Sequence, residues 1–131
     1  MNKETFEAGL AQRRAVLGND YVERSLANMD DFTRPLQELV TEMCWGTIWT
    51  RPGLPPKMRS LLNVGLLAAL NRPHELALHV RGALRTGCTR EEIQEVLLQV
   101  AVYCGVPAGV DSFRVAAEVL REAERETTTG A

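Results

Sequence analysis

The sequence predicts an all-α protein, a bundle of six or seven helices. Apolar residues recur at helical spacing along the chain, and no convincing apolar–polar alternation indicates a strand. Glycine, proline and Asn/Asp clusters interrupt this pattern about every ten to fifteen residues. With 131 residues, 45% of them apolar and 24% charged, the composition is typical of one globular domain. We therefore expect a single domain over 1–131, with a polar, frayed tail at about 127–131.

Three helices are expected in the N-terminal part. An apolar pattern among charged residues predicts a helix over about 4–17, and Gly18-Asn19-Asp20 can end it and start a second helix over about 20–29. The third helix is expected from about 31–33 to the Thr50–Pro56 loop, with Pro35 in its first turn.

The third helix has two distinct faces. Its predicted core face is apolar and consists of Phe32, Leu36, Leu39, Val40, Met43 and Thr47. The other face carries two carboxylates and both tryptophans of the chain, namely Glu38, Glu42, Trp45 and Trp49. This second face is either a core or interface stripe with its acids at the rim, or the wall of an aromatic pocket with one acid inside.

Four further helices are expected after the proline-rich loop. The first, about 56–70, is apolar almost all round and is predicted to be the central buried helix, where Arg59 must be paired or reach water. The second runs from Pro73 to about 85. A capping box at Thr89 predicts the third helix, to about 103, with an inward stripe that ends at Cys104. The last helix follows Gly105-Val106-Pro107.

Composition and cysteine spacing argue against several functions. The net charge of −2 gives no strong field for nucleic acid or an anionic membrane. Cys44, Cys88 and Cys104 lie far apart, without zinc spacing, and are expected to be buried free thiols in a reducing cytoplasm. The start of the chain has no signal-peptide core, and the longest apolar run, about 61–70, is too short to cross a bilayer. These features predict a cytoplasmic protein.

The two histidines, His74 and His79, lie five residues apart on one helix and point about 140° away from each other. They cannot both bind one metal ion from a regular helix, so no metal site is expected. His79 shares a face with Glu75, one turn earlier. It is either a structural histidine bonded to that carboxylate, or a general acid or base that the carboxylate tunes.

Several segments resemble the carboxymuconolactone decarboxylase family. The resemblance rests on residues 66–84, on 89–96 and on the turn 103–109, and extends to 42–46 and 49–56. It covers most of residues 3–125 in the expected order. The resemblance implies the all-α fold of alkylhydroperoxidase D-like proteins, assembled as a homo-oligomer, a trimer or a hexamer. The peroxidase branch has a Cys-x-x-Cys pair whose places here are Arg72 and Glu75, which favours the decarboxylase branch.

The decarboxylase branch implies a small lactone dicarboxylate as substrate and decarboxylation of 4-carboxymuconolactone to 3-oxoadipate enol-lactone in protocatechuate catabolism. The lactone is its own electron sink, so no cofactor is expected. The candidate catalytic residues are then His79 as acid or oxyanion donor, Glu75 to orient it, and Glu42 as an arginine partner or proton relay. The candidate substrate-binding residues are Arg59, Arg51, Trp45, Trp49 and Tyr103. A thiol-redox or non-catalytic oligomeric protein of the same fold remains the alternative.

Overall fold

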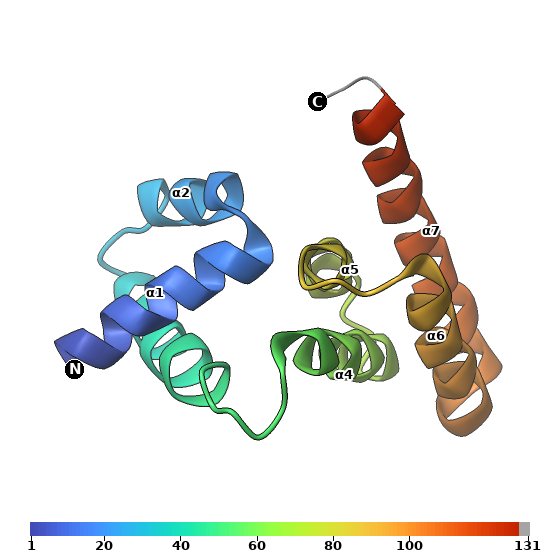
Figure 1. The fold of residues 1–131 in the computed structure, drawn as a ribbon, viewed down its shortest axis with the longest axis horizontal. Helices are drawn as coiled ribbons and strands as arrows, with labels where there is room; N and C mark the ends of the chain where they lie inside the picture. The colour runs from blue at the N-terminus through green and yellow to red at the C-terminus, as the bar shows by residue number, and fades with distance from the viewer. Residues whose placement is uncertain (129–131) are drawn as a thin grey trace. The chain divides into compact units, whose positions relative to one another are not determined.

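The computed structural model describes residues 1–128, and every regular element among them is a helix, which confirms the all-α prediction (Figure 1). The elements in chain order are α1 (Lys3–Leu17), α2 (Asn19–Ala27), α3 (Arg34–Leu39), η1 (Val40–Ile48), α4 (Pro56–Ala69), α5 (Pro73–Arg85), α6 (Arg90–Cys104) and α7 (Val106–Thr128). The chain divides into two compact units, an N-terminal unit, Met1–Pro56, and a C-terminal unit, Lys57–Ala131. No helix within the described residues is long and apolar enough to cross a membrane.

Two glycines bring α1 and η1 into close contact in the N-terminal unit. A Cβ atom on Gly9 would lie 2.7 Å from the backbone nitrogen of Gly46 and would overlap the carbonyl oxygen of Thr41. A Cβ atom on Gly46 would overlap the carbonyl oxygen of Thr5. Because neither position has room for a side chain, the two backbones approach more closely than alanine would allow. Asn2 caps α1 through a 2.9 Å hydrogen bond from the Thr5 amide to its side chain.

The predicted third helix is an α-helix followed by a π-helix. Over η1 the hydrogen bonds reach back five residues, as from the Trp49 amide to the Cys44 carbonyl oxygen at 3.0 Å. The predicted core face is wrong: Phe32 lies in the turn before α3, and within η1 the wider turn changes the angular position of each side chain. Phe32 is 92% exposed, and Leu36, Leu39 and Met43 are each more than half exposed. The buried face instead contains Thr41, Trp45 and Trp49.

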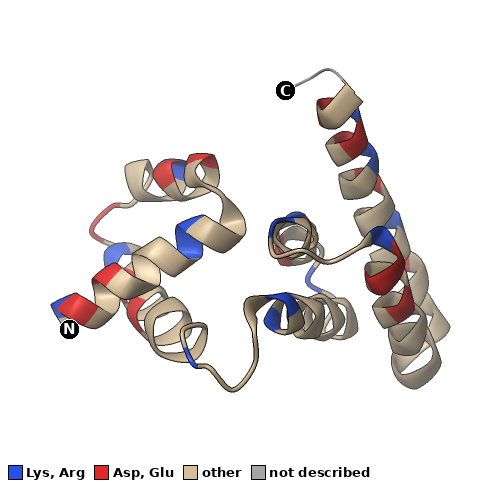
Figure 2. Cartoon of the chain, in the orientation of Figure 1, with Lys and Arg blue, Asp and Glu red and all other residues tan. Residues whose placement is uncertain are grey.

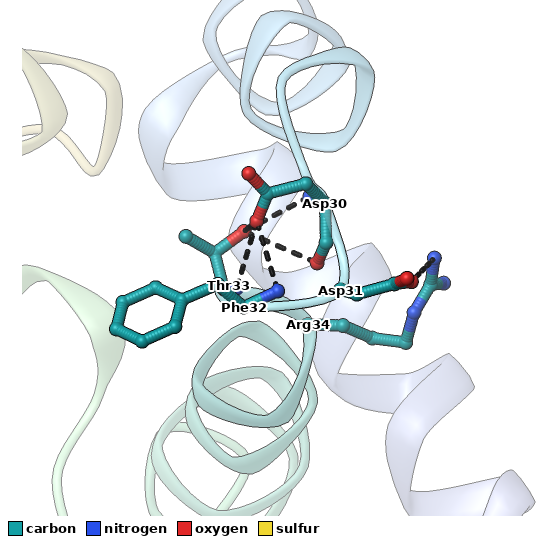
Figure 3. A network of polar contacts seen from close by, with 5 residues as sticks. All are labelled: Asp30, Asp31, Phe32, Thr33 and Arg34. Carbon is teal, nitrogen blue, oxygen red and sulfur yellow. Dashed lines mark hydrogen bonds and ion pairs between the residues drawn. The ribbon is translucent and has the colours of Figure 1, made fainter.

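The loop before α3 is fixed by the carboxylate of Asp30 (Figure 3). The Asp30 carboxylate accepts hydrogen bonds from the amides of Phe32 at 3.1 Å and Thr33 at 2.9 Å, and from the Thr33 hydroxyl at 3.0 Å. The amide of Thr33 is the main cause of a lowered pKa at Asp30. These bonds hold residues 30–33 in a turn, so the helix begins at Arg34.

The core of the C-terminal unit is formed by all four of its helices. Its buried members are apolar, namely Val64, Ala68, Leu76, Val80, Ala83, Cys88, Ile93, Leu97, Val100, Ala116 and Val119. The prediction that the helix over 56–70 is the central buried helix is wrong. α4 buries only the face with Ser60, Val64 and Ala68, whereas Met58 and Leu62 are each 52% exposed.

Helix ends and crossings in this unit follow local signals. Thr89 and Glu92 form the predicted capping box of α6 through bonds of 3.0 and 2.8 Å. Gly109 allows α7 to approach α6 closely, because a Cβ there would lie 3.0 Å from the Cα atom of Ala101. Of the three free thiols, Cys88 is buried as predicted. Cys44 and Cys104 are exposed, so the prediction of three buried thiols is wrong for these two.

The last helix is longer than the sequence predicts. α7 continues to Thr128, so 127–128 are helical rather than a frayed tail, and residues 129–131 lie outside the described chain. Acidic and basic residues crowd this end of the helix (Figure 2). Arg81 on α5 pairs with Glu122 at 3.2 Å and with Glu126 at 2.7 Å, one turn apart on α7. These long-range pairs hold the end of α7 in helical form.

Candidate active site

His79 lies in the middle of α5 and is half-buried. Burial lowers its pKa below the usual value of 6.5, and the negative charge of Glu75 partly opposes this by raising the pKa. Glu75 is one turn earlier on the same helix and is exposed. The larger effect of burial makes the neutral imidazole the favoured form near pH 7, and a catalytic role of the Glu75–His79 pair stays a prediction.

Arg59 and Tyr103 lie on two other helices of the same unit. Arg59 is half-buried on α4, next to Ser60, whose hydroxyl accepts a 2.8 Å hydrogen bond from the Thr86 hydroxyl at the end of α5. Tyr103 is 81% exposed near the end of α6. It lines an apolar groove of about 450 Å³ between α4 and α6, together with Met58, Leu62, Leu66, Val96, Gln99 and Cys104.

The two tryptophans are packed against each other inside the N-terminal unit. Their ring centroids are 4.7 Å apart and the rings are stacked at 26°. Trp45 is 3% exposed and Trp49 is 4% exposed, which agrees with the interpretation of this face as a core stripe. Both acids of the stripe, Glu38 and Glu42, are half-buried. A role of the rings in substrate binding stays a prediction.

Glu42 and Arg51 border this stripe. The Glu42 side chain accepts a 3.0 Å hydrogen bond from the backbone amide of Asn2, which ties η1 to the start of α1. Arg51 is exposed in the loop after η1, and its backbone amide donates to the Ile48 carbonyl oxygen at 3.1 Å. The contact of Glu42 with Asn2 is structural, and its role as a proton relay stays a prediction.

The eight candidate residues are distributed over both units. Glu42, Trp45, Trp49 and Arg51 belong to the N-terminal unit, and Arg59, Glu75, His79 and Tyr103 belong to the C-terminal unit. The two tryptophans are stacked, and Glu75 lies one turn before His79 on α5. Within residues 1–128, no three His, Cys, Asp or Glu side chains cluster so that they could hold a metal ion.

Arg13 on α1 carries a buried charge that the sequence did not predict. Its side chain is 4% exposed and donates hydrogen bonds to Gln37, Thr41 and Ser25. The signal was present in the spacing, because Gly9, Arg13, Val16 and Leu17 form the buried face of α1. An arginine at a core position of a helix is a candidate functional residue.

Comparisons with known proteins place the chain in a family. The sequence model of the carboxymuconolactone decarboxylase family matches residues 34–118. The chain is 45% identical over 122 residues to a nitrosuccinic acid decarboxylase of Metarhizium robertsii, covering 93% of this chain and 85% of that protein. It is 37% identical over 121 residues to the 4-carboxymuconolactone decarboxylase of Acinetobacter baylyi, covering 92% of this chain and 90% of that protein. The protein is therefore a member of the carboxymuconolactone decarboxylase family.

Proposed function

We propose that the protein is a cofactor-independent carboxy-lyase that converts 4-carboxymuconolactone to 3-oxoadipate enol-lactone and CO2. The substrate carries a carboxylate and a carboxymethyl arm on the γ-carbon of a butenolide ring. When the bond to the carboxylate breaks, its electron pair moves through the ring double bond to the lactone carbonyl oxygen. The resulting 2-oxyfuran anion takes up a proton at the α-carbon, and the released carboxylate leaves as neutral CO2.

The observation that supports this chemistry best is the half-buried imidazole of His79, whose pKa is lowered by burial. A neutral imidazole has one N–H group that can donate to an oxyanion without adding a fixed positive charge. We therefore assign His79 the role of oxyanion donor in preference to general acid, and Glu75 the role of orienting it. Arg59 and Arg51 are the proposed partners of the substrate carboxylates, Trp45, Trp49 and Tyr103 complete the proposed binding residues, and Glu42 is the proposed proton relay.

Nitrosuccinate is the second candidate substrate, because the relative named for it is 45% identical to this chain. The two molecules share their reactive features. In the lactone, the carbon that bears the carboxylate is connected through the ring double bond to the carbonyl group, which accepts the electron pair. In nitrosuccinate, the carbon that bears the carboxylate also bears the nitro group, which accepts it. Each molecule also has a carboxymethyl arm. Loss of CO2 from the nitro-bearing carbon would leave a nitronate, which a neutral hydrogen-bond donor stabilises in the same way as an oxyfuran anion.

Homo-oligomer formation, as a trimer or a hexamer, is part of the proposal, as is a cytoplasmic location. Large apolar side chains are exposed on both units of the single chain. They include Phe32, Leu36 and Met43 in the N-terminal unit, and Leu62, Leu66 and Val102 in the C-terminal unit. Extended apolar surfaces of this kind are typical of subunit interfaces.

Purified protein should be incubated with each candidate substrate and the product measured directly. With enzymatically generated 4-carboxymuconolactone, ultraviolet absorbance should fall as the double bond leaves conjugation, with one CO2 released per lactone. Nitrosuccinate in a parallel reaction decides between the two substrates by their values of kcat/KM. A hydroperoxide with a dithiol reductant tests the thiol-redox alternative. Folded, oligomeric protein that decarboxylates neither 4-carboxymuconolactone nor nitrosuccinate would overturn the proposal.

A further inference from the structure

Arg13 places a permanent positive charge in the interior of the N-terminal unit. Its guanidinium donates to Gln37 Oε1 at 3.0 Å, Thr41 Oγ1 at 3.3 Å and Ser25 Oγ at 3.2 Å, while its buried Nε–H has no acceptor. All three partners are neutral, and no carboxylate among residues 1–128 forms an ion pair with Arg13. A buried guanidinium without a negative partner is strongly unfavourable, so a nearby anion would stabilise it.

A pocket of about 360 Å³ lies against the partners of this arginine. Its polar lining consists of Tyr21, Arg24, Ser25, Asn28, Thr33 and Gln37. Ser25 and Gln37 belong both to the pocket and to the hydrogen bonds of Arg13, so the buried guanidinium lies behind the pocket wall. Arg24 adds a second positive charge that is exposed, and no carboxylate in the described part of the chain pairs with it. The volume is in the usual range for a small-molecule site.

The hydrogen bonds of Arg13 leave donor groups available on Ser25 and Gln37, the two of its three partners that line the pocket. Because the Ser25 oxygen accepts from Arg13, its own O–H is available to donate elsewhere. Because the Gln37 carbonyl oxygen accepts from Arg13, its NH2 group is directed away from the guanidinium. Two acids that flank lining residues in the sequence are already engaged, since Glu23 pairs with Arg14 and Asp30 accepts from the residues of its own turn.

We propose that this pocket binds a small molecule through an oxyanion group, a carboxylate or a phosphate. Arg24 makes the direct ion pair, and Ser25 and Gln37 donate hydrogen bonds that the charge of Arg13 strengthens. The site lies wholly within the N-terminal unit and does not depend on the proposed decarboxylation.

The test follows the side-chain Nε–H resonance of Arg13 by NMR in the full-length protein. Succinate and inorganic phosphate are titrated separately, against sodium chloride at equal ionic strength. We expect a saturable shift with at least one of the two oxyanions. Arg24→Gln should weaken that binding by about tenfold or more, since it removes a charge-assisted pair. The control is Arg34→Gln, which removes an equal charge from an exposed arginine paired with Asp31 and outside the pocket lining.

Three results would overturn the site. One is the absence of any shift with either oxyanion, which is also the result if another copy of the chain already fills the pocket. Another is an equal shift with chloride. The third is unchanged binding in Arg24→Gln, which would locate the anion elsewhere. Arg24 is exposed, so this variant keeps its fold even if substitution of the buried Arg13 does not.

Discussion

At the scale of single residues, two opposing influences act on His79. Burial lowers its pKa, whereas the charge of Glu75 raises it. The sequence predicted the second influence, because the spacing of four residues is local and visible in the chain. It could not predict the first, since burial depends on which helices cover α5. The balance between the two determines whether the imidazole donates as a neutral or as a charged group near neutral pH.

His79→Ala should lower turnover by at least about 10²-fold, the usual loss when an oxyanion donor or a general acid is removed. His79→Gln retains a neutral donor but has no titratable proton, so it should recover part of the rate if His79 polarises an oxygen. Turnover, melting temperature and oligomer size should be measured on the same preparations. A well-folded alanine variant with turnover within about threefold of the original would remove His79 from the chemistry.

The stability of the protein should fall when His79 becomes protonated. Its folded pKa is below the reference value of 6.5, so the unfolded chain binds the proton more readily. His79 protonation does not change the free energy of unfolding well above about pH 6.5. As the pH falls below that value, it lowers the free energy of unfolding progressively. The melting temperature of His79→Gln should therefore depend less steeply on pH than that of the unaltered protein. Both proteins share all carboxylates, so equal slopes would contradict the prediction.

The three thiols should be dispensable for decarboxylation. Cys44 and Cys104 are exposed, and the Cys88 thiol donates to the Lys57 carbonyl oxygen at 3.4 Å, a bond that a serine hydroxyl can replace. A variant with all three cysteines changed to serine should keep most of its turnover, measured by CO2 release. A folded triple variant without activity would support the thiol-redox alternative.

At the scale of helices, the sequence predicted boundaries better than faces. The helix expected from Pro73 to about 85 is observed as Pro73–Arg85, and the capping box at Thr89 was correctly identified. Such signals are local. Faces depend on partners far away in sequence, so Phe32, Leu36 and Leu39, which precede η1, proved exposed. The wider turn of η1 also changes the helical repeat, and Met43 on it is exposed as well. The end of α7 was missed for a similar reason, because Arg81 lies 45 residues before Glu126.

The contact between α1 and η1 should be sensitive to a single methyl group. Gly9→Ala should lower the free energy of unfolding by about 1–3 kcal/mol, because the new Cβ would overlap the η1 backbone. Gly53→Ala is the control, since a Cβ there meets no atom within 4 Å, and its effect should stay within about 0.5 kcal/mol. Urea denaturation of the two variants measures both values. If the two variants have equal free energies of unfolding, the close contact between α1 and η1 does not contribute to stability.

At the scale of the whole molecule, the exposed apolar groove between α4 and α6 is the main difference from the sequence prediction. α4 is apolar almost all round, and the single chain covers only one side of it. Sequence periodicity identifies a surface that must be covered, but not the molecule that covers it. The candidate site was predictable to a similar extent, because the spacing of Glu75 and His79 is local, whereas the burial of Trp45 and Trp49 depends on the fold.

Leu62→Asp should shift the protein toward smaller species if the groove is a subunit interface. The substitution places a charge among apolar side chains that line the groove, where an interface would have to bury it. Gln94→Glu is the control, since it adds one charge at an exposed position of α6 outside the groove lining. Sedimentation velocity should show dissociation in the first variant alone. An unchanged oligomer with Asp at position 62 would exclude this groove from the interface.

The stacked pair Trp45–Trp49 has a consequence for spectroscopy. Both tryptophans of the chain lie in the N-terminal unit, so tryptophan fluorescence reports the unfolding of that unit alone. Far-ultraviolet circular dichroism reports the helices of both units. If the two signals change at different denaturant concentrations, the units unfold separately, and one free energy does not describe the chain. The intrinsic chromophores thus measure the cooperativity of the molecule without any added label.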